Sequence, residues 1–239
     1  QVVVDAEGKY PALTSNKGRY LHFTGTGDPD THFGFLTKNP GTGLAAIDMK
    51  EGTSDIEIDH FEVTGTAYSG IAIRTYPYCD ADIGRESFTQ HNTVLHHNYV
   101  HDIDGEGFYI GPSHYHLDYS PTTTDACSPG YAEAALRGVE IHHNTVEDVG
   151  RDGIQVGAAV EGTRIYNNVI RRYALKEDYG HIGGLQINPG TVGHIYGNRI
   201  ESDPSSPADN AIQWAGGVDG PTYIYNNLII GTQTAFMAL

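Results

Sequence analysis

Basic side chains are scarce in this 239-residue sequence, which has 14 Lys and Arg against 30 Asp and Glu and a formal net charge of −16. Nucleic acids and anionic membrane surfaces are bound mainly by basic protein surfaces, so neither is expected as the principal partner. Long apolar runs are also missing, since no stretch approaches the roughly 18 residues that a transmembrane helix needs. We therefore predict neither nucleic-acid binding nor membrane insertion.

Cysteine is limited to two residues, and the sequence has no Cys-x-x-Cys motif. A metal centre built on thiolates is therefore not expected. Apolar heptads and a three-residue glycine period are absent as well, which excludes a coiled coil and a collagen helix. Glycine is nevertheless abundant, at 30 residues, and apolar residues recur at short, regular intervals. This recurrence indicates internal repeats.

One eight-residue pattern, an alternating apolar strand followed by an asparagine and a second short strand, returns along the chain. It occupies residues 93–100, 139–146, 163–170, 193–200 and 222–229, and residues 55–63 fit it with Phe61 at the asparagine position. The asparagines are Asn98, Asn144, Asn168, Asn198 and Asn227. The basic turn is about 24 residues long, which is the separation of Asn144 and Asn168, and insertions lengthen other turns. A second strand, of the type Gly-Ile-x-Val, accompanies each copy.

The alternation predicts how the copies pack. Ile141, Val146 and Ile154 point to one side of their strands, while His142 and Gln155 point to the other. One copy cannot bury its apolar side alone, but stacking of successive copies at about 4.8 Å completes both the backbone ladder and the core. The asparagines are expected to bond along the stack. The sequence therefore predicts an all-β fold, a right-handed parallel β-helix (solenoid), rather than a propeller or a leucine-rich repeat.

These repeats resemble the pectate-lyase-like superfamily of right-handed β-helices, through Ile-x-x-Asn-x-Val/Ile and Gly-Ile-x-Val motifs over residues 47–239. Residues 101–111 and 152–157 are similar to a group of secreted, surface-associated bacterial β-helix proteins. The resemblance implies a secreted or cell-surface location and work on extracellular carbohydrate, as lyase, hydrolase, epimerase or adhesin. The catalytic motifs of polygalacturonases, alginate epimerases and the chondroitinase B family are not found, so no catalytic residue is carried over from them.

We expect a single β-helix domain over 1–239, with irregular entry coils at 1–46 and regular coils at 47–239. The last segment reads as a strand without a polar cap, which suggests a part of a longer chain and allows end-to-end stacking with other copies. Two insertions, at 74–92 and 111–137, leave consecutive coils after the same strand. Each contains one cysteine. Two free thiols are the alternative, but the placement on neighbouring loops predicts a Cys79–Cys127 disulfide, which favours an oxidising, extracellular setting.

Outward positions of the second strand predict a binding surface. Tyr109, Gln155, Gln186 and Gln213 should form one column, and amides and aromatic rings of this kind bind sugars. The neighbouring turn supplies Asp152, and the second insertion supplies His114 and His116 as further substrate-binding candidates. Solvation of an ordinary sheet is the alternative role of such a column.

Candidate catalytic residues follow from the needs of uronic-acid chemistry, which requires a neutralised carboxylate, a base and an acid. Arg151 and Lys176 could neutralise the carboxylate, and His181 and Tyr109 could move protons. A hydrolase needs instead a pair of carboxyl groups, which Glu106 and Asp152 could provide.

Two metal hypotheses arise from the sequence. Asp102, Asp104 and Glu106 place oxygen ligands at alternate positions around a glycine, a pattern that can wrap Ca²⁺. His96 and His142 should stack on adjacent coils, followed by Tyr166, Tyr196 and Tyr225; this column could bind zinc or a glycan, but cross-coil stacking is the simpler role.

The leading hypothesis is therefore a secreted carbohydrate-binding or carbohydrate-processing β-helix, resembling a polysaccharide lyase, whose partner is a polysaccharide or surface glycan. The alternative is a non-catalytic structural or adhesive repeat module of a bacterial surface protein or extracellular fibre. The insertions favour the enzyme, because loops added to one edge of a solenoid usually shape a binding face. The missing catalytic motifs favour the module.

Overall fold

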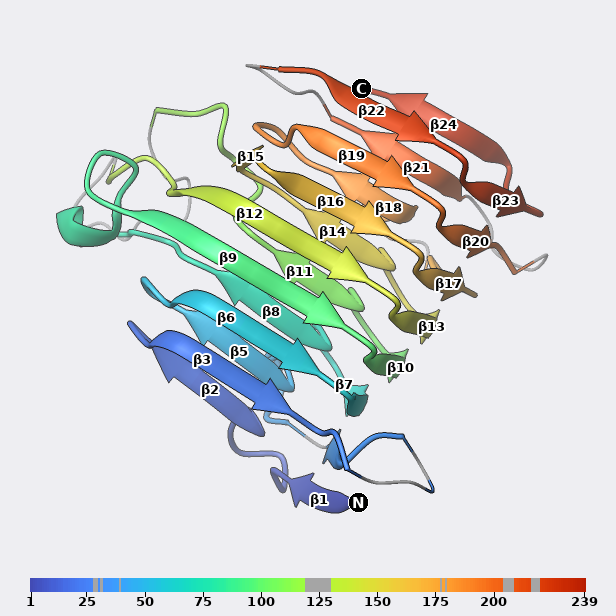
Figure 1. Ribbon diagram of the computed structural model, residues 1–239, viewed down its shortest axis with the longest axis horizontal. Helices are drawn as coiled ribbons and strands as arrows, with labels where there is room; N and C mark the ends of the chain where they lie inside the picture. Colours follow the sequence, from blue (N-terminus) through green and yellow to red (C-terminus); the bar gives the residue numbers. More distant parts are fainter. Residues whose placement is uncertain are drawn as a thin grey trace.

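The computed structural model describes residues 1–27, 30, 32–38, 40–118, 130–176, 178, 180–203, 209–215 and 220–239. The chain winds through successive coils that stack side by side, and the two ends of the chain lie at opposite ends of the stack (Figure 1). None of the described residues forms a helix long and apolar enough to cross a membrane.

Three parallel sheets of eight strands each make up the fold, and each coil contributes strands to the sheets in the same order. The first sheet contains β1 (Val2–Asp5), β4 (Phe35–Lys38), β7 (Phe61–Thr66), β10 (Tyr99–Ile103), β13 (Thr145–Val149), β17 (Val169–Arg171), β20 (Arg199–Glu201) and β23 (Leu228–Ile230). The second contains β2 (Leu13–Asn16), β5 (Ile47–Lys50), β8 (Ile71–Arg74), β11 (Phe108–Ile110), β14 (Ile154–Val156), β18 (Gly183–Ile187), β21 (Asn210–Trp214) and β24 (Thr234–Ala238).

The third sheet contains β3 (Arg19–Thr24), β6 (Ser54–Asp59), β9 (Thr89–His96), β12 (Ala135–His142), β16 (Thr163–Tyr166), β19 (Gly193–Tyr196) and β22 (Thr222–Tyr225), and β15 (Ala159–Glu161) pairs with β12 beside them. A 3₁₀ turn, η1 (Ala81–Ile83), lies in the first insertion. The predicted all-β parallel solenoid is thus confirmed. Its regular ladder begins earlier than the sequence suggested, because β1, β2 and β3 in the entry segment already pair in register with the next coil.

The core is a stack of identical apolar layers. Ile58, Leu95, Ile141 and Ile165 are register partners on successive coils of the third sheet and are completely buried or nearly so. Ile154 and Val156 fill the equivalent place on the second sheet. Glycine precedes the second-sheet strands because the coils approach closely there: a Cβ added to Gly107 would lie 2.5 Å from the Gly153 carbonyl oxygen.

Asparagine side chains form a continuous ladder at the turn from the third sheet to the first. Asn144 shows the repeating unit: its side-chain Nδ2 donates to the Leu95 carbonyl of the preceding coil at 2.9 Å and to Asn168 Oδ1 of the next at 3.0 Å. The Asn144 backbone N–H also donates to Asn168 Oδ1, at 3.1 Å. The same three contacts recur at Asn98, Asn168 and Asn198. At Phe61, only the backbone N–H takes part, donating to Asn98. The predicted asparagine column is confirmed.

Both insertions leave the solenoid between the second and third sheets, after the neighbouring strands β8 and β11, as predicted. They also pack on each other. Arg85 of the first insertion donates from Nε to the Glu133 carbonyl at 3.1 Å and from Nη2 to the Leu117 carbonyl at 3.1 Å, and its guanidinium lies 4.0 Å from the Tyr115 ring centroid. Cys79 is not a free thiol. Cys127 lies outside the described residues, so its pairing with Cys79 stays a prediction.

Removal of one ladder side chain tests the importance of this turn. Asn168→Ala takes away the acceptor for Asn144 and the donor for the Ile141 carbonyl, all of them buried. Each buried group left without a partner costs about 1–3 kcal/mol, so we expect a loss of about 3 kcal/mol in the free energy of unfolding, measured in urea.

The matched control is Asn167→Gly on the same turn, because Asn167 has a positive φ and Gly197 occupies the equivalent place one coil later. Its stability should change little. Equal losses in the two variants would contradict a specific role for the ladder.

Candidate functional site

The predicted column on the outer face of the second sheet exists. Tyr109, Gln155, Gln186 and Gln213 are consecutive register partners on β11, β14, β18 and β21. They are not exposed, however, since their fractional exposures are 9%, 1%, 7% and 4%. The column is therefore a covered polar layer, and sugar binding by these residues stays a prediction that requires access to it.

Ser113 of the second insertion is the centre of the hydrogen bonds over this layer. Its Oγ accepts from Gln155 Nε2 at 2.8 Å and from Asn188 Nδ2 at 3.2 Å, and it lies 2.8 Å from the Tyr109 hydroxyl. The insertion thus covers the middle of the face. Gln155 Oε1 is buried without a hydrogen-bond partner among the described residues.

Tyr109 also belongs to an aromatic cage around Arg74 that sequence reasoning missed. The Arg74 guanidinium lies 4.5 Å from the Tyr109 ring centroid, 5.0 Å from that of Tyr68 and 5.3 Å from that of Tyr76. The Tyr109 hydroxyl lies 3.0 Å from that of Tyr76. Contacts of this kind hold Tyr109 in place by cation–π attraction, and they leave it in a fixed, covered position rather than at an open surface.

Beside the covered layer, four ionisable side chains from three coils meet. His181 Nδ1 lies 3.3 Å from Asp152 Oδ2 and 3.4 Å from Glu106 Oε1. The same Glu106 oxygen lies 3.4 Å from Arg151 Nη1, and Arg151 Nε donates to Asp178 Oδ2 at 2.7 Å. We call Glu106, Arg151, Asp152 and His181 the acid–base cluster. The sequence named all four residues, and the structure brings them together.

Burial divides the cluster into an inner and an outer layer. The carboxyl groups of Glu106 and Asp152 are at most 1% exposed, whereas the side chains of Arg151 and His181 are 33% and 34% exposed. Asp152 Oδ1 also accepts from the Gly183 backbone N–H at 2.7 Å, which fixes the inner layer. The partly exposed Arg151 and His181 therefore contact two buried acids, Glu106 and Asp152.

Burial and neighbouring charges in the cluster shift the pKa values of three groups. Burial raises the pKa of Asp152 to about 6, although the hydrogen bonds from His181 and Gly183 oppose this. The hydrogen bond to Asp152 raises the pKa of His181, despite its partial burial. The pKa of Arg151 is raised, because attraction to Glu106 and Asp178 outweighs desolvation. Since no described contact uses His181 Nε2, this atom is available for proton transfer.

Other predicted site residues lie apart from the cluster. Lys176 pairs with Asp104 at 3.1 Å, and Asp102 pairs with His101 at 2.7 Å, both in exposed positions. His114 packs against the buried Glu133, to which its backbone N–H donates at 2.8 Å, and His116 is exposed. Asp102 and Asp104 thus have other described partners than Glu106, and calcium binding by the three residues stays a prediction.

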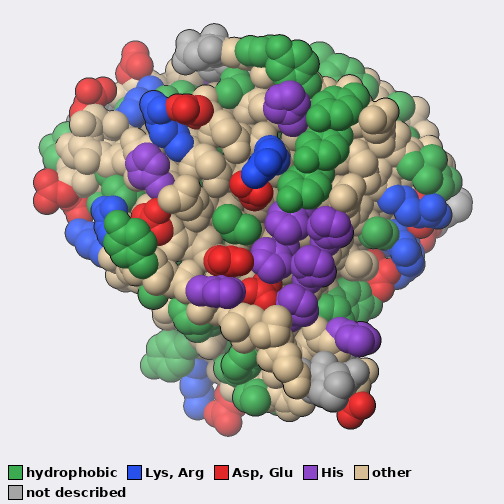
Figure 2. All heavy atoms as spheres, in the orientation of Figure 1, with side chains coloured by type: hydrophobic (Ala, Val, Ile, Leu, Met, Phe, Trp, Pro, Cys, Tyr) green, Lys and Arg blue, Asp and Glu red, His purple; other side chains and the backbone are tan. Residues whose placement is uncertain are grey.

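Imidazole rings form a double column on the third sheet and its turn, visible as the purple group in Figure 2. His96 and His142 stack at 4.9 Å, and the stack continues through Tyr166, Tyr196 and Tyr225, as the sequence predicted. Because the rings stack on one another, both faces of His142, Tyr166 and Tyr196 are occupied. The column therefore presents ring edges, which cannot stack on a sugar.

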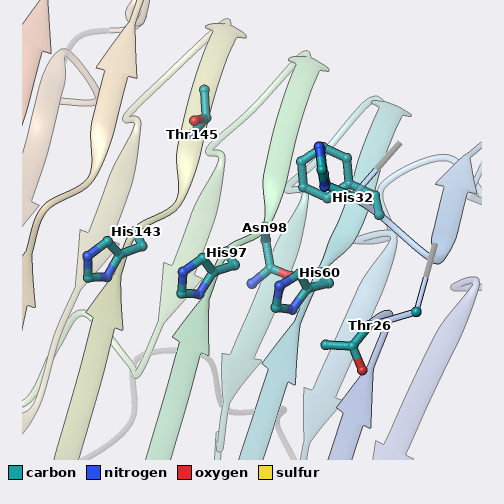
Figure 3. A pocket seen from close by; sticks show the side chains of 9 residues that line it. Thr26, His32, His60, His97, Asn98, His143 and Thr145 are labelled. Carbon is teal, nitrogen blue, oxygen red and sulfur yellow. The ribbon is translucent and has the colours of Figure 1, made fainter. Parts of the chain in front are cut away.

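A second imidazole column stands at the turn and was not predicted. His60, His97 and His143 stack at 5.1 Å with their planes 3° apart (Figure 3). All three have positive φ and stand one residue before the ladder position. In later coils, Asn167, Gly197 and Asn226 occupy this same place. The repeated His-His pairs at 96–97 and 142–143, aligned with Asp59-His60, were the signal in the sequence.

These three histidines, with Thr26 and His32, line a cavity of about 420 Å³. Within the turn, neighbouring nitrogens are close: His96 Nδ1 lies 2.8 Å from His97 Nδ1, and His142 Nδ1 lies 2.9 Å from His143 Nδ1. Desolvation and the adjacent imidazoles lower the pKa of His97 and lower that of His142 to about 4. His97 and His142 are therefore largely neutral near pH 7.

Within the described part of the chain, three sets of side chains bring ligand atoms within 4.8 Å of one another: Glu106–Asp152–His181, Asp59–His60–His96 and His22–Glu57–Asp59. The first set has Arg151 against Glu106, a fixed cation that opposes a metal ion, so it suits acid–base chemistry. The two sets that share Asp59 have only imidazole partners among the described ion pairs.

Comparison with known proteins gave no match to a family model, to a curated protein or to a solved structure.

The low pKa of His142 predicts a specific acid sensitivity. Between pH 6.5 and about 4, the unfolded chain binds a proton at this residue, whereas the folded chain does not. The free energy of unfolding therefore falls as the pH falls through this window. His142→Tyr removes this loss and keeps the stack, since tyrosine stands at the same place on the next coil. Urea unfolding of chelator-treated protein at pH 7 and pH 4.5 should show a smaller pH effect in the variant; an unchanged effect would contradict the assignment.

Proposed function

We propose that this protein is a secreted or cell-surface carbohydrate-processing β-helix of the right-handed, pectate-lyase-like kind, in which His181 is the proton-transfer residue. The observation that carries the proposal is the acid–base cluster, in which a partly exposed imidazole and a partly exposed guanidinium share one buried carboxylate. Groups with perturbed pKa values that converge in this way are typical of functional sites.

Burial of Glu106 and Asp152 supports a positioning role for these acids. Neither carboxyl group is exposed enough to meet a polymer, so the pair of acids does not suit the hydrolase alternative, in which both carboxyl groups contact the substrate. They fit instead the task of orienting His181 through Nδ1, which directs Nε2 outward. This arrangement is that of an imidazole base held by a carboxylate.

Arg151 is the complement that a uronic acid requires. In β-elimination, a base removes the proton from C5 beside the carboxylate, the C4–C5 double bond forms, and the C4–O bond breaks. His181 Nε2 would take that proton and return it to the leaving oxygen, while Arg151 would stabilise the charge that develops on the substrate carboxylate. The net charge of −16 makes this local cation necessary for binding an acidic polymer.

The polar layer next to the cluster supports a sugar ligand. Gln186 lies over Asp152, and swapping its amide orientation places its nitrogen 3.1 Å from both Asp152 carboxyl oxygens. Amides and hydroxyls of this layer, around Ser113, are groups that bind sugar hydroxyls. Calcium has no part in this scheme, because Arg151 supplies the positive charge.

A matched pair of histidine variants tests the proposal. His181→Gln should lower the rate of formation of unsaturated uronate ends at least about 100-fold, since general acid–base catalysis contributes at least this much. His194→Gln, the same change on β19 of the third sheet, should leave the rate unchanged. The assay is ultraviolet absorbance over a panel of acidic polysaccharides, with reducing ends measured in parallel on acidic and neutral polymers.

If the wild-type chain acts on no polysaccharide of the panel, the enzyme hypothesis is contradicted, and the alternative of a non-catalytic adhesive or structural module is favoured. Equal rates in both variants would remove His181 from the mechanism.

The pH profile gives an independent check. A base acts only when deprotonated, and the pKa of His181 is raised above its ordinary value of 6.5, so the activity should rise with pH through a value above 6.5. Asp152→Asn removes the main cause of the shift, and we expect the rising limb to move to lower pH as the maximal rate falls. A limb that stays in place would contradict the role of Asp152 in setting the His181 pKa.

A further inference from the structure

The turn between the third and first sheets carries a second group of ligand-type side chains, whereas the acid–base cluster lies at the turn between the first and second sheets. Asp59 closes β6, His60 follows it in the turn, and His96 closes β9 on the next coil. One ligand atom of each lies within 4.8 Å of the others. We propose that Asp59, His60 and His96 bind a divalent transition-metal ion of the class that prefers imidazole, with Zn²⁺ as its representative.

The donor set fits this class. Two imidazoles and one carboxylate are ligands for Zn²⁺ and related ions, whereas Ca²⁺ and Mg²⁺ prefer a shell of oxygens. Three protein ligands also leave a coordination position open for water or a small ligand. His60 lines the 420 Å³ cavity of Figure 3, so an ion on this residue lies at the border of a space that admits such a ligand.

Asp59 is the fixed point of the site. Its side chain is 3% exposed, and its Oδ1 lies 2.5 Å from His60 Nδ1, while its Oδ2 lies 2.6 Å from His22 Nε2. Thr24 donates to Oδ1 at 2.7 Å. Burial acts to raise the pKa of Asp59, but the hydrogen bonds from His22, Thr24 and His60 outweigh it and lower that pKa. A buried carboxylate held only by neutral or titrating groups is a position where a cation stabilises the fold.

Further polar groups hold the ligands in place. His96 Nε2 lies 3.0 Å from Glu57 Oε1, and its Nδ1 lies 2.8 Å from His97 Nδ1. One of these two nitrogens would exchange its partner for the ion, and the contact at the other would orient the imidazole and fix its tautomer. Binding through His60 Nδ1 would replace its 2.5 Å contact with Asp59 Oδ1 by bonds from both residues to the ion.

The repeat supplies unusually close controls. His60 and His143 occupy the same left-handed position, and asparagine stands there naturally at Asn167 and Asn226. His96 and His142 likewise share one column, in which tyrosine stands at Tyr166. Substitution by the residue of the later coil therefore keeps the backbone and the stack. Only substitutions of His60 and His96, the histidines near Asp59, should weaken metal binding.

The experiment titrates the chelator-treated full chain with Zn²⁺ by calorimetry and with Co²⁺ by its visible d–d absorption. We expect one tight equivalent per chain. His60→Asn and His96→Tyr should weaken this equivalent about 100-fold or more, whereas His143→Asn and His142→Tyr should leave it within about 3-fold.

Circular dichroism and urea unfolding of the metal-free variants show whether each remains folded. Absence of a tight equivalent, or equal loss in both pairs of variants, would overturn the proposal and leave only diffuse binding by surface histidines. Activity on polysaccharide does not enter this test, so its result is independent of the proposed function.

Discussion

In-register stacking of parallel strands is the constraint on which the remaining structure depends. A parallel ladder places each residue directly beside its counterpart one coil away, so a side chain that can pair with itself is favoured at every level. The asparagine ladder is the strongest case, since Asn98, Asn144 and Asn168 satisfy backbone groups that the turn would otherwise leave buried and unpaired. Both imidazole columns follow from the same rule, because their histidines also lie beside their counterparts on the next coil.

Two consequences of stacking oppose each other on the surface. Rings that stack along the axis are stabilised, but their faces are no longer available to ligands, as in the column from His96 to Tyr225. Ligand binding and catalysis must therefore involve ring edges, or positions at which the repeat is interrupted. Both candidate sites lie away from these stacked faces: Asp59 replaces the first histidine of its column, and the acid–base cluster lies in the turns that precede β11, β14 and β18.

Charge distinguishes the two sites. Arg151 pairs with the buried Glu106 beneath His181, so that cluster already holds a permanent cation and can move a proton without a metal ion. Around Asp59, only imidazoles partner the carboxylate among the described ion pairs, and these groups accept either a proton or a metal. The same residue types thus serve different chemistry according to whether a permanent cation lies beside them.

The sequence by itself determined the coil, the columns and the ladder, because alternation and asparagine spacing are local patterns that stacking turns into contacts. It also named Glu106, Arg151, Asp152 and His181, since turn residues of adjacent coils must lie close. Only the tertiary structure decided that the glutamine column is covered by Ser113 and its insertion, that Asp102 and Asp104 have other described partners than Glu106, and that Asp59 meets His60 and His96. These outcomes depend on how the insertions fold back and on which rotamer each side chain adopts, and neither is specified by the period of the repeat.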